Sequence, residues 1–140
     1  MRLEPNPVNP CFGCGGANPR GMRLVFEQDD EAQRIRGNFR IPAEYQGSGG
    51  FVHGGIIALV LDEAMGKVNR FRQAHAVTAD LQVEYLRPMR VEQYLVIEAF
   101  QVKKDGRNLH HECEIRNTSG QVLARGKGRF VEVDPARYKP

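Results

Sequence analysis

The most constraining feature of this sequence is an apolar run that follows a His-Gly-Gly motif at residues 53–55 and extends to about Phe71. The run is too long for a strand, and its composition favours a helix even though Gly66 weakens the second half. Apolar residues occupy nearly every side of this helix, which is typical of a central element rather than a surface helix. We therefore expect the rest of the chain to pack around it.

Two carboxylates, Asp62 and Glu63, interrupt this apolar run. A charged carboxylate buried without a partner is costly, so its presence in such a helix needs an explanation. Glu63 has Lys67 four residues later, a spacing that gives this acid an ordinary structural role. Asp62 has only apolar and small neighbours one turn away. Asp62 is therefore the stronger candidate for a chemical role, with Glu63 as the alternate.

The part of the chain after this run has the patterns of antiparallel strands. Residues 77–85 alternate, with odd-numbered apolar side chains on one face and Thr78 and Asp80 together on the polar face. The segment 95–103 is apolar on both faces, as in an interior strand, and a turn at 104–107 closes a hairpin. The expected strands cover residues 23–28, 34–41, 77–85, 95–103, 109–116 and 121–133.

These patterns predict an α+β fold in which a long central helix packs against an antiparallel sheet of five to six strands. At 140 residues the chain has the size of one domain, which we expect to span 1–140. Residues 1–21 contain four prolines and four glycines, a density that excludes a regular element. We expect an irregular leader there that packs on the body of the protein.

Composition excludes several classes of function. The formal net charge is +3, and basic residues are interspersed with acidic ones, so we expect no nucleic-acid partner. No stretch approaches the roughly 18 apolar residues of a membrane helix, so we expect no membrane partner. The first residues lack the apolar core of a signal peptide, and we expect a cytoplasmic protein.

The three cysteines are an odd number, which argues against a disulfide framework. Cys11 and Cys14 have the Cys-x-x-Cys spacing, which supplies two of the four ligands that structural zinc requires. A second paired motif is absent from the sequence, so we expect no metal site. A thioredoxin-type pair is not expected either, because no strand precedes the motif. We expect both cysteines to be small residues of the packed leader.

The His53-Gly54-Gly55 motif, with Asp62 nine positions after the histidine, resembles that of hotdog-fold acyl-CoA thioesterases of the phenylacetate-pathway (PaaI-like) type. The segments 77–88, 11–15 and 18–21 are similar to parts of the same family, and the element order fits from about 22 to 133. The resemblance implies a hotdog fold and hydrolysis of an acyl- or aryl-acyl-CoA, without a cofactor. It also implies a homodimer or a dimer of dimers, with the catalytic acid across the interface from the His-Gly-Gly turn.

The start of the helix has chemistry that suits this activity. The N–H groups of Gly54 and Gly55 lie at the positive end of the helix dipole and can hold a carbonyl oxygen that becomes an oxyanion. The alternative is that these glycines only let the helix end approach the sheet. His53 would hold the turn or contact the thioester carbonyl. Asp62 would activate water or attack directly.

The resemblance suggests further site residues. Thr78 is at the position where some relatives orient the water with a hydroxyl; the alternative is a solvated strand residue. Several relatives have an asparagine shortly before the histidine, where this chain offers Gln46 or Ser48. Basic residues could meet the phosphates of CoA, or could instead protect a sheet edge from aggregation. These residues are Arg87, Arg90, Arg125, Lys127 and Arg129.

Two other functions fit a hotdog fold. One is a protein that binds acyl-CoA without turnover, as the hotdog domains of some regulators do. The other is a dehydratase, which the present spacing of histidine and acid fits less well. We therefore expect a thioester hydrolase, with acyl-CoA binding alone as the alternative.

Overall fold

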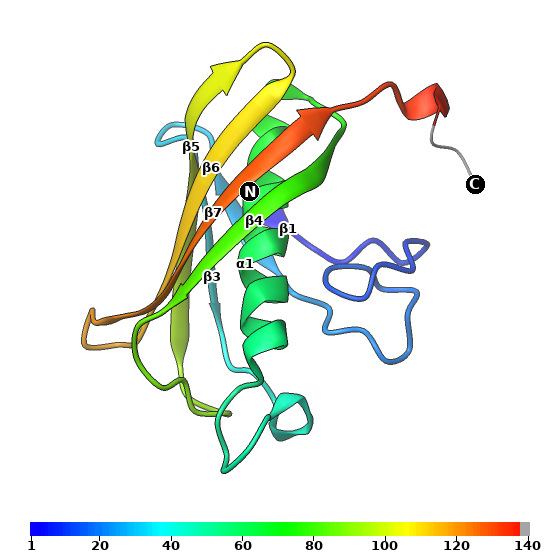
Figure 1. Cartoon of the computed structure of the whole chain (residues 1–140). Coiled ribbons are helices and arrows are strands. Elements are labelled where there is room, and N and C mark those ends of the chain that lie inside the picture. Colours follow the sequence, from blue (N-terminus) through cyan, green and yellow to red (C-terminus); the bar gives the residue numbers. More distant parts are fainter. Residues whose placement is uncertain (138–140) are drawn as a thin grey trace.

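A long helix lies against one face of an antiparallel sheet in the computed structural model, which describes residues 1–137 (Figure 1). The sheet has seven strands in the order β1-β2-β3-β5-β6-β7-β4. The helix is α1 (Gly54–Val68), and a short 3-10 turn at Asn69–Arg72 follows it. The strands are β1 (Arg2–Leu3), β2 (Phe26–Asp29), β3 (Arg34–Phe39), β4 (Ala76–Tyr85), β5 (Leu95–Asp105), β6 (Asn108–Arg116) and β7 (Val122–Glu132).

This architecture confirms the predicted hotdog fold, with two differences in the strands. The sheet has seven strands rather than five to six, because β1 pairs with β2. The prediction that residues 1–21 hold no regular element is therefore wrong for Arg2 and Leu3. These two residues precede the first proline, Pro5, so their N–H groups are available for a sheet ladder.

Helix α1 buries one apolar stripe against the sheet. Each fully buried Val, Leu, Ile or Met side chain contributes roughly 1.5–3 kcal/mol to folding. The opposite side of α1, which includes Leu59, Asp62 and Glu63, is only half-buried in one copy of the chain. The expectation of a fully covered helix is therefore only partly met. The buried stripe consists of Ile57, Val60, Leu61, Ala64, Met65 and Val68.

Two glycines of β7 let α1 approach the sheet closely. A Cβ atom on Gly126 would lie 3.1 Å from Met65 Cε, and one on Gly128 would lie 2.7 Å from Phe130 Cε1. A larger residue at either position would force the helix away from the sheet or move the core side chains.

The leader packs on the side of α1 that faces away from the sheet, as expected (Figure 1). The Leu24 N–H donates to Gly13 O at 2.9 Å, and the Met22 N–H donates to Phe12 O at 2.7 Å. The ring of Phe12 meets Tyr45 edge-on, with centroids 6.3 Å apart. Over residues 1–137, no helix is long and apolar enough to cross a membrane.

Strand β4 contains a bulge that changes which way Thr78 faces. Thr78 pairs with Phe130, but the next pair along the strand is Asp80 with Arg129, so Ala79 is an extra residue. Phe130 is buried beneath α1, and the neighbouring Arg129 faces the other side of the sheet. The prediction that Thr78 and Asp80 share a polar face is therefore wrong, because the bulge turns Thr78 toward α1.

Strand β4 lies at the end of the sheet order, so one of its edges has no partner strand within the described residues. Along most of its ten residues the side chains are exposed, including the apolar Val77, Leu81 and Tyr85 at 46%, 36% and 55%. A long edge strand with apolar side chains is a ready template for pairing with another chain.

Candidate active site

The start of α1 leaves one backbone donor free. His53 caps the helix: its Nδ1 accepts the Gly55 N–H at 2.9 Å, and its carbonyl oxygen accepts the N–H groups of Ile56 and Ile57. The Gly54 N–H has no acceptor among residues 1–137. Of the two predicted oxyanion donors, only Gly54 is therefore available to a ligand in this arrangement.

Side chains around this turn fix its geometry. The Tyr85 hydroxyl donates to Gly54 O at 2.8 Å, which ties the end of β4 to the start of α1. Because His53 Nδ1 accepts a hydrogen bond, the neutral imidazole carries its proton on Nε2, from which it can donate to a bound ligand. Sequence reasoning did not assign Tyr85 to the turn, since an aromatic residue at a strand end is too common to be a signal.

A mostly apolar cleft of about 310 Å³ lies beside Gly54. Arg87 lines this cleft, and the Arg90 guanidinium lies over the Phe51 ring at 5.2 Å from its centroid. The cleft thus combines apolar walls, one free N–H and nearby positive charge. Its walls are Phe51, Val52, Gly54, Ile57, Tyr85, Leu86, Arg87, Pro88 and Met89.

Asp62 and Thr78 form a second group of functional side chains. The Thr78 hydroxyl donates to Asp62 Oδ1 at 2.7 Å, a contact that the β4 bulge makes possible. The two residues line a separate cleft of about 270 Å³, together with Phe130 and residues from the second half of α1. A carboxylate whose one oxygen is held in this way keeps its other oxygen for a proton or an electrophile.

The two groups are too far apart to act together within one copy of the chain. Asp62 follows Gly54 by eight residues on the same helix. At 1.5 Å per residue their backbones are separated by about 12 Å along the helix axis. A carbonyl oxygen bound to the Gly54 N–H is therefore out of reach of Asp62 of the same chain.

The alternates are placed differently. Glu63 faces the leader, where Cys11 Sγ lies 3.5 Å from its Oε1, and it forms no ion pair with Lys67 within the described part of the chain. Gln46 and Ser48 are exposed in the loop before His53, whose N–H donates to Tyr45 O at 3.0 Å. Neither side chain makes a hydrogen bond to any other described residue.

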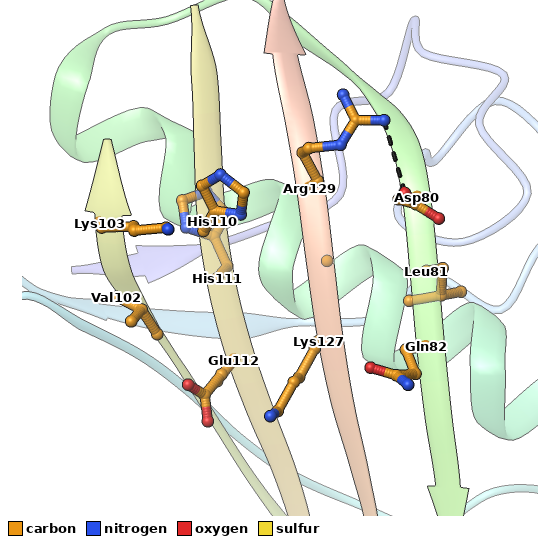
Figure 2. Close-up of a pocket in the computed structure, with 11 residues that line it drawn as sticks. Asp80, Leu81, Gln82, Val102, Lys103, His110, His111, Glu112, Lys127 and Arg129 are labelled. Atoms are coloured by element: carbon orange, nitrogen blue, oxygen red, sulfur yellow. Dashed lines mark hydrogen bonds and ion pairs between the residues drawn. The ribbon is translucent and has the colours of Figure 1, made fainter. Parts of the chain in front are cut away.

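The basic residues fall into two separate groups. Arg125, Lys127 and Arg129 of β7 face away from α1, and Figure 2 shows Lys127 and Arg129 over a pocket of about 620 Å³ on that face. Arg125 donates to Glu114 at 3.0 Å, and Arg129 pairs with Asp80 at 3.5 Å. Lys127 has no carboxylate partner among residues 1–137. Arg87 and Arg90, by contrast, lie near the Gly54 cleft.

A helix packed on a long antiparallel sheet, with a His-Gly-Gly turn at its start and an acid two turns on, is the arrangement that the resemblance to hotdog-fold thioesterases implies. The chain belongs to the thioesterase superfamily, whose family model matches residues 49–124.

Individual relatives agree with this assignment. Acyl-coenzyme A thioesterase THEM4 of Rattus norvegicus is 33% identical over 116 residues, which are 82% of this chain and 50% of that protein. The chain thus spans about half the length of the curated relatives it matches. The crystal structure of RHA08564, a thioesterase superfamily protein, superimposes with a TM-score of 0.81 at 31% identity, covering 88% of this chain and 60% of the other.

Two more distant structures share the fold. The E. coli PaaI protein from the phenylacetic acid degradation operon has a TM-score of 0.68 at 18% identity and covers 73% of this chain and 74% of its own. The smu.793 protein of Streptococcus mutans UA159, solved with acetyl CoA bound, has a TM-score of 0.69 at 20% identity and covers 72% and 82%.

Proposed function

We propose that this protein hydrolyses acyl-CoA thioesters to a free acid and CoA, in sites that two copies of the chain build together. The observation that carries the proposal is the separation of the two functional groups. The free Gly54 N–H lies at one end of α1, and the Asp62–Thr78 pair lies about 12 Å further along it. Each copy offers two half-sites, and a second copy is needed to join them.

The free edge of β4 provides the way to join them. When two copies of one strand pair antiparallel about a two-fold axis, the start of each strand lies beside the end of the other. Thr78 is near the start of β4, and Tyr85, which is bonded to Gly54, is at its end. Such pairing brings Asp62 of the partner subunit toward the cleft at Gly54.

In this site the reaction needs no cofactor. The Gly54 N–H and the helix dipole stabilise the negative charge that develops on the thioester oxygen. The partner subunit's Asp62 removes a proton from water while the water oxygen bonds to the carbonyl carbon. Collapse of the tetrahedral intermediate breaks the C–S bond, and the CoA thiolate takes the proton from Asp62. Direct attack by Asp62, through an anhydride that water then hydrolyses, is the other order of events.

Substrate binding would use the cleft beside Gly54. Its apolar walls suit an acyl group, and the exposed Arg87 and Arg90 can meet the phosphates of CoA. A fold relative from Streptococcus mutans that binds acetyl CoA supports this class of ligand. On β7, Arg125 and Arg129 already have carboxylate partners, so Lys127 is the cation of that strand best suited to a phosphate.

The first test is release of free thiol from a panel of short, medium and aryl acyl-CoA thioesters. Asp62→Asn should lower turnover by at least about 100-fold, because it removes the general base or nucleophile. Asp105→Asn, which makes the same chemical change in an exposed hairpin, is the control and should keep full turnover. Full activity of Asp62→Asn would refute the mechanism. Binding of acyl-CoA without turnover by the wild-type protein would favour the non-catalytic alternative.

A second variant tests the shared site. Gly54→Pro removes the free N–H at the first helical position, where proline is well tolerated. His53 has φ −58° and ψ 135°, a conformation that a following proline favours. Both single variants should be inactive. When they are unfolded together and refolded, about half of the dimers are mixed, and about a quarter of wild-type turnover should return. No recovery in verified mixed dimers would refute the shared site.

A further inference from the structure

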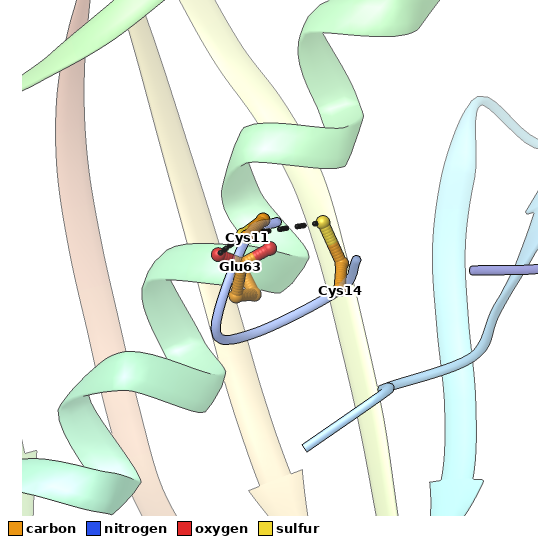
Figure 3. A group of neighbouring side chains, drawn as sticks. All are labelled: Cys11, Cys14 and Glu63. Atoms are coloured by element: carbon orange, nitrogen blue, oxygen red, sulfur yellow. Dashed lines mark hydrogen bonds between the residues drawn. The ribbon is translucent and has the colours of Figure 1, made fainter. Parts of the chain in front are cut away.

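A cluster of Cys11, Cys14 and Glu63 lies on the face of α1 that points away from the sheet (Figure 3). Cys11 Sγ is 3.6 Å from Cys14 Sγ and 3.5 Å from Glu63 Oε1. One ligand atom from each of the three residues lies within 4.8 Å of the other two. We propose that these three side chains bind a zinc ion that fastens the leader to α1, with water as the fourth ligand.

Two of the three separations match a tetrahedral zinc site. With Zn–S bonds of about 2.3 Å and a Zn–O bond of about 2.0–2.2 Å, tetrahedral geometry places two sulfurs about 3.8 Å apart and a sulfur and oxygen about 3.5 Å apart. The observed distances of 3.6 Å and 3.5 Å agree with these values to within a few tenths of an ångström. The third separation, between Cys14 and Glu63, is within 4.8 Å.

The backbone around the cluster holds the two cysteines in place. A Cβ atom on Gly13 would lie 2.5 Å from Glu63 Cδ, so the leader backbone crosses directly over the carboxylate. The Gly15 N–H donates to Cys11 O at 3.0 Å, and the Leu24 N–H donates to Gly13 O at 2.9 Å. All three ligand residues are half-buried, which limits competition from water. The loop thus presents both sulfurs toward the same side of α1.

The donor set of the cluster suits zinc. Two cysteine sulfurs and one carboxylate oxygen are ligand types that zinc binds in proteins. Zinc would displace the thiol protons and bind both thiolates. Two thiolates and one carboxylate around Zn²⁺ leave one net negative charge, which the neighbouring Lys67 can offset.

Glu63 is the ligand that sequence reasoning missed. It is separated from Cys14 by 49 residues and lacks a metal-binding motif, so only the packing of the leader on α1 brings it to the cysteines. The site is distinct from the proposed catalytic groups, since Asp62 faces Thr78 instead. Its role is structural: the ion would close the loop between the leader and the middle of the helix.

The test uses the full chain without a histidine tag, purified under reducing conditions and supplied with one equivalent of zinc. After gel filtration, metal analysis should find about one zinc per chain. Cobalt in place of zinc should give thiolate-to-metal charge-transfer absorption in the near ultraviolet. The double variant Cys11→Ser/Cys14→Ser should lose both signals, and Glu63→Gln should weaken zinc binding at least about tenfold.

Controls separate this site from other zinc binding. Cys113→Ala removes the buried third cysteine and should keep full zinc content. Zinc should also raise the melting temperature of the wild type but not of the double variant. The proposal is overturned if the reduced wild type, with three titratable thiols, retains no zinc. It is equally overturned if the double variant retains as much zinc as the wild type.

Discussion

A buried histidine leads us to expect that the free energy of unfolding depends on pH. His111 on β6 is 1% exposed, its Nε2 lies 2.7 Å from Asn69 Oδ1, and its ring packs on Phe130 with centroids 5.2 Å apart. Its Nδ1 has no hydrogen-bond partner among the described residues. Burial lowers the pKa of His111 to about 4, because the protonated ring would lose its hydration.

The sign and size of the effect follow from linkage. The histidine side chain has a pKa of about 6.5 in the unfolded chain. Below that pH the unfolded chain binds a proton at this residue that the folded chain does not bind. The stability that neutral His111 contributes is therefore fully present above pH 6.5 and decreases as the pH falls toward 4. Each pH unit in this window costs about 1.4 kcal/mol, so His111 alone should remove about 2 kcal/mol between pH 7.5 and pH 5.

Urea unfolding at a fixed protein concentration, from pH 7.5 to pH 5, measures this loss. His111→Gln removes the titrating ring and keeps a donor for Asn69, so its stability should depend less on pH by about 2 kcal/mol over the same range. His110→Gln, at the neighbouring position of β6, is the matched control. If wild type and His111→Gln lose stability in parallel, a buried neutral His111 is not the source of the pH dependence.

Three further substitutions test other parts of the structure. Thr78→Val should lower kcat about 10- to 100-fold in the thioesterase assay, whereas Thr78→Ser should preserve it, because only the hydroxyl bonds to the proposed catalytic acid. Leu81→Lys on the free edge of β4 should shift the protein toward monomer in light scattering and reduce turnover, whereas Val8→Lys in the leader should do neither. Gly128→Ala should lower the urea-measured unfolding free energy by about 1–3 kcal/mol, since the new methyl group would press on Phe130.

The overall fold was predictable because its elements have long, regular patterns. The helix was expected from residue 55 to about 71, and it spans Gly54–Val68 with a 3-10 turn after it. The strand expected at 95–103 spans Leu95–Asp105. The length of an apolar run and the turn residues that bound it distinguish a long helix from a strand, so the order and type of these elements could be derived without the structure.

The features that sequence reasoning missed depend on contacts between distant segments. The bulge at Ala79 exists because β4 pairs with β7 in a particular register, and the local sequence does not signal it. Without it, strict alternation places Thr78 on the wrong face, away from Asp62. His53 accepts the Gly55 N–H, one of the two expected oxyanion donors, and which of the two adjacent donors stays free depends on one side-chain rotamer. The pattern of apolar and polar residues along the sequence does not determine such details.

The geometry of the proposed dimer follows from one helix and one strand. Thr78 is bonded to Asp62 and Tyr85 is bonded to Gly54, so the two ends of β4 carry the two half-sites. A two-fold axis near the middle of β4, at residues 81–82, sets both ends against their complements at once. Sliding the partner strand by two residues would separate each pair of half-sites by about 7 Å, more than twice a hydrogen-bond length. In the proposed dimer, catalysis would therefore require one register of the interface, with the apolar Leu81 at its centre.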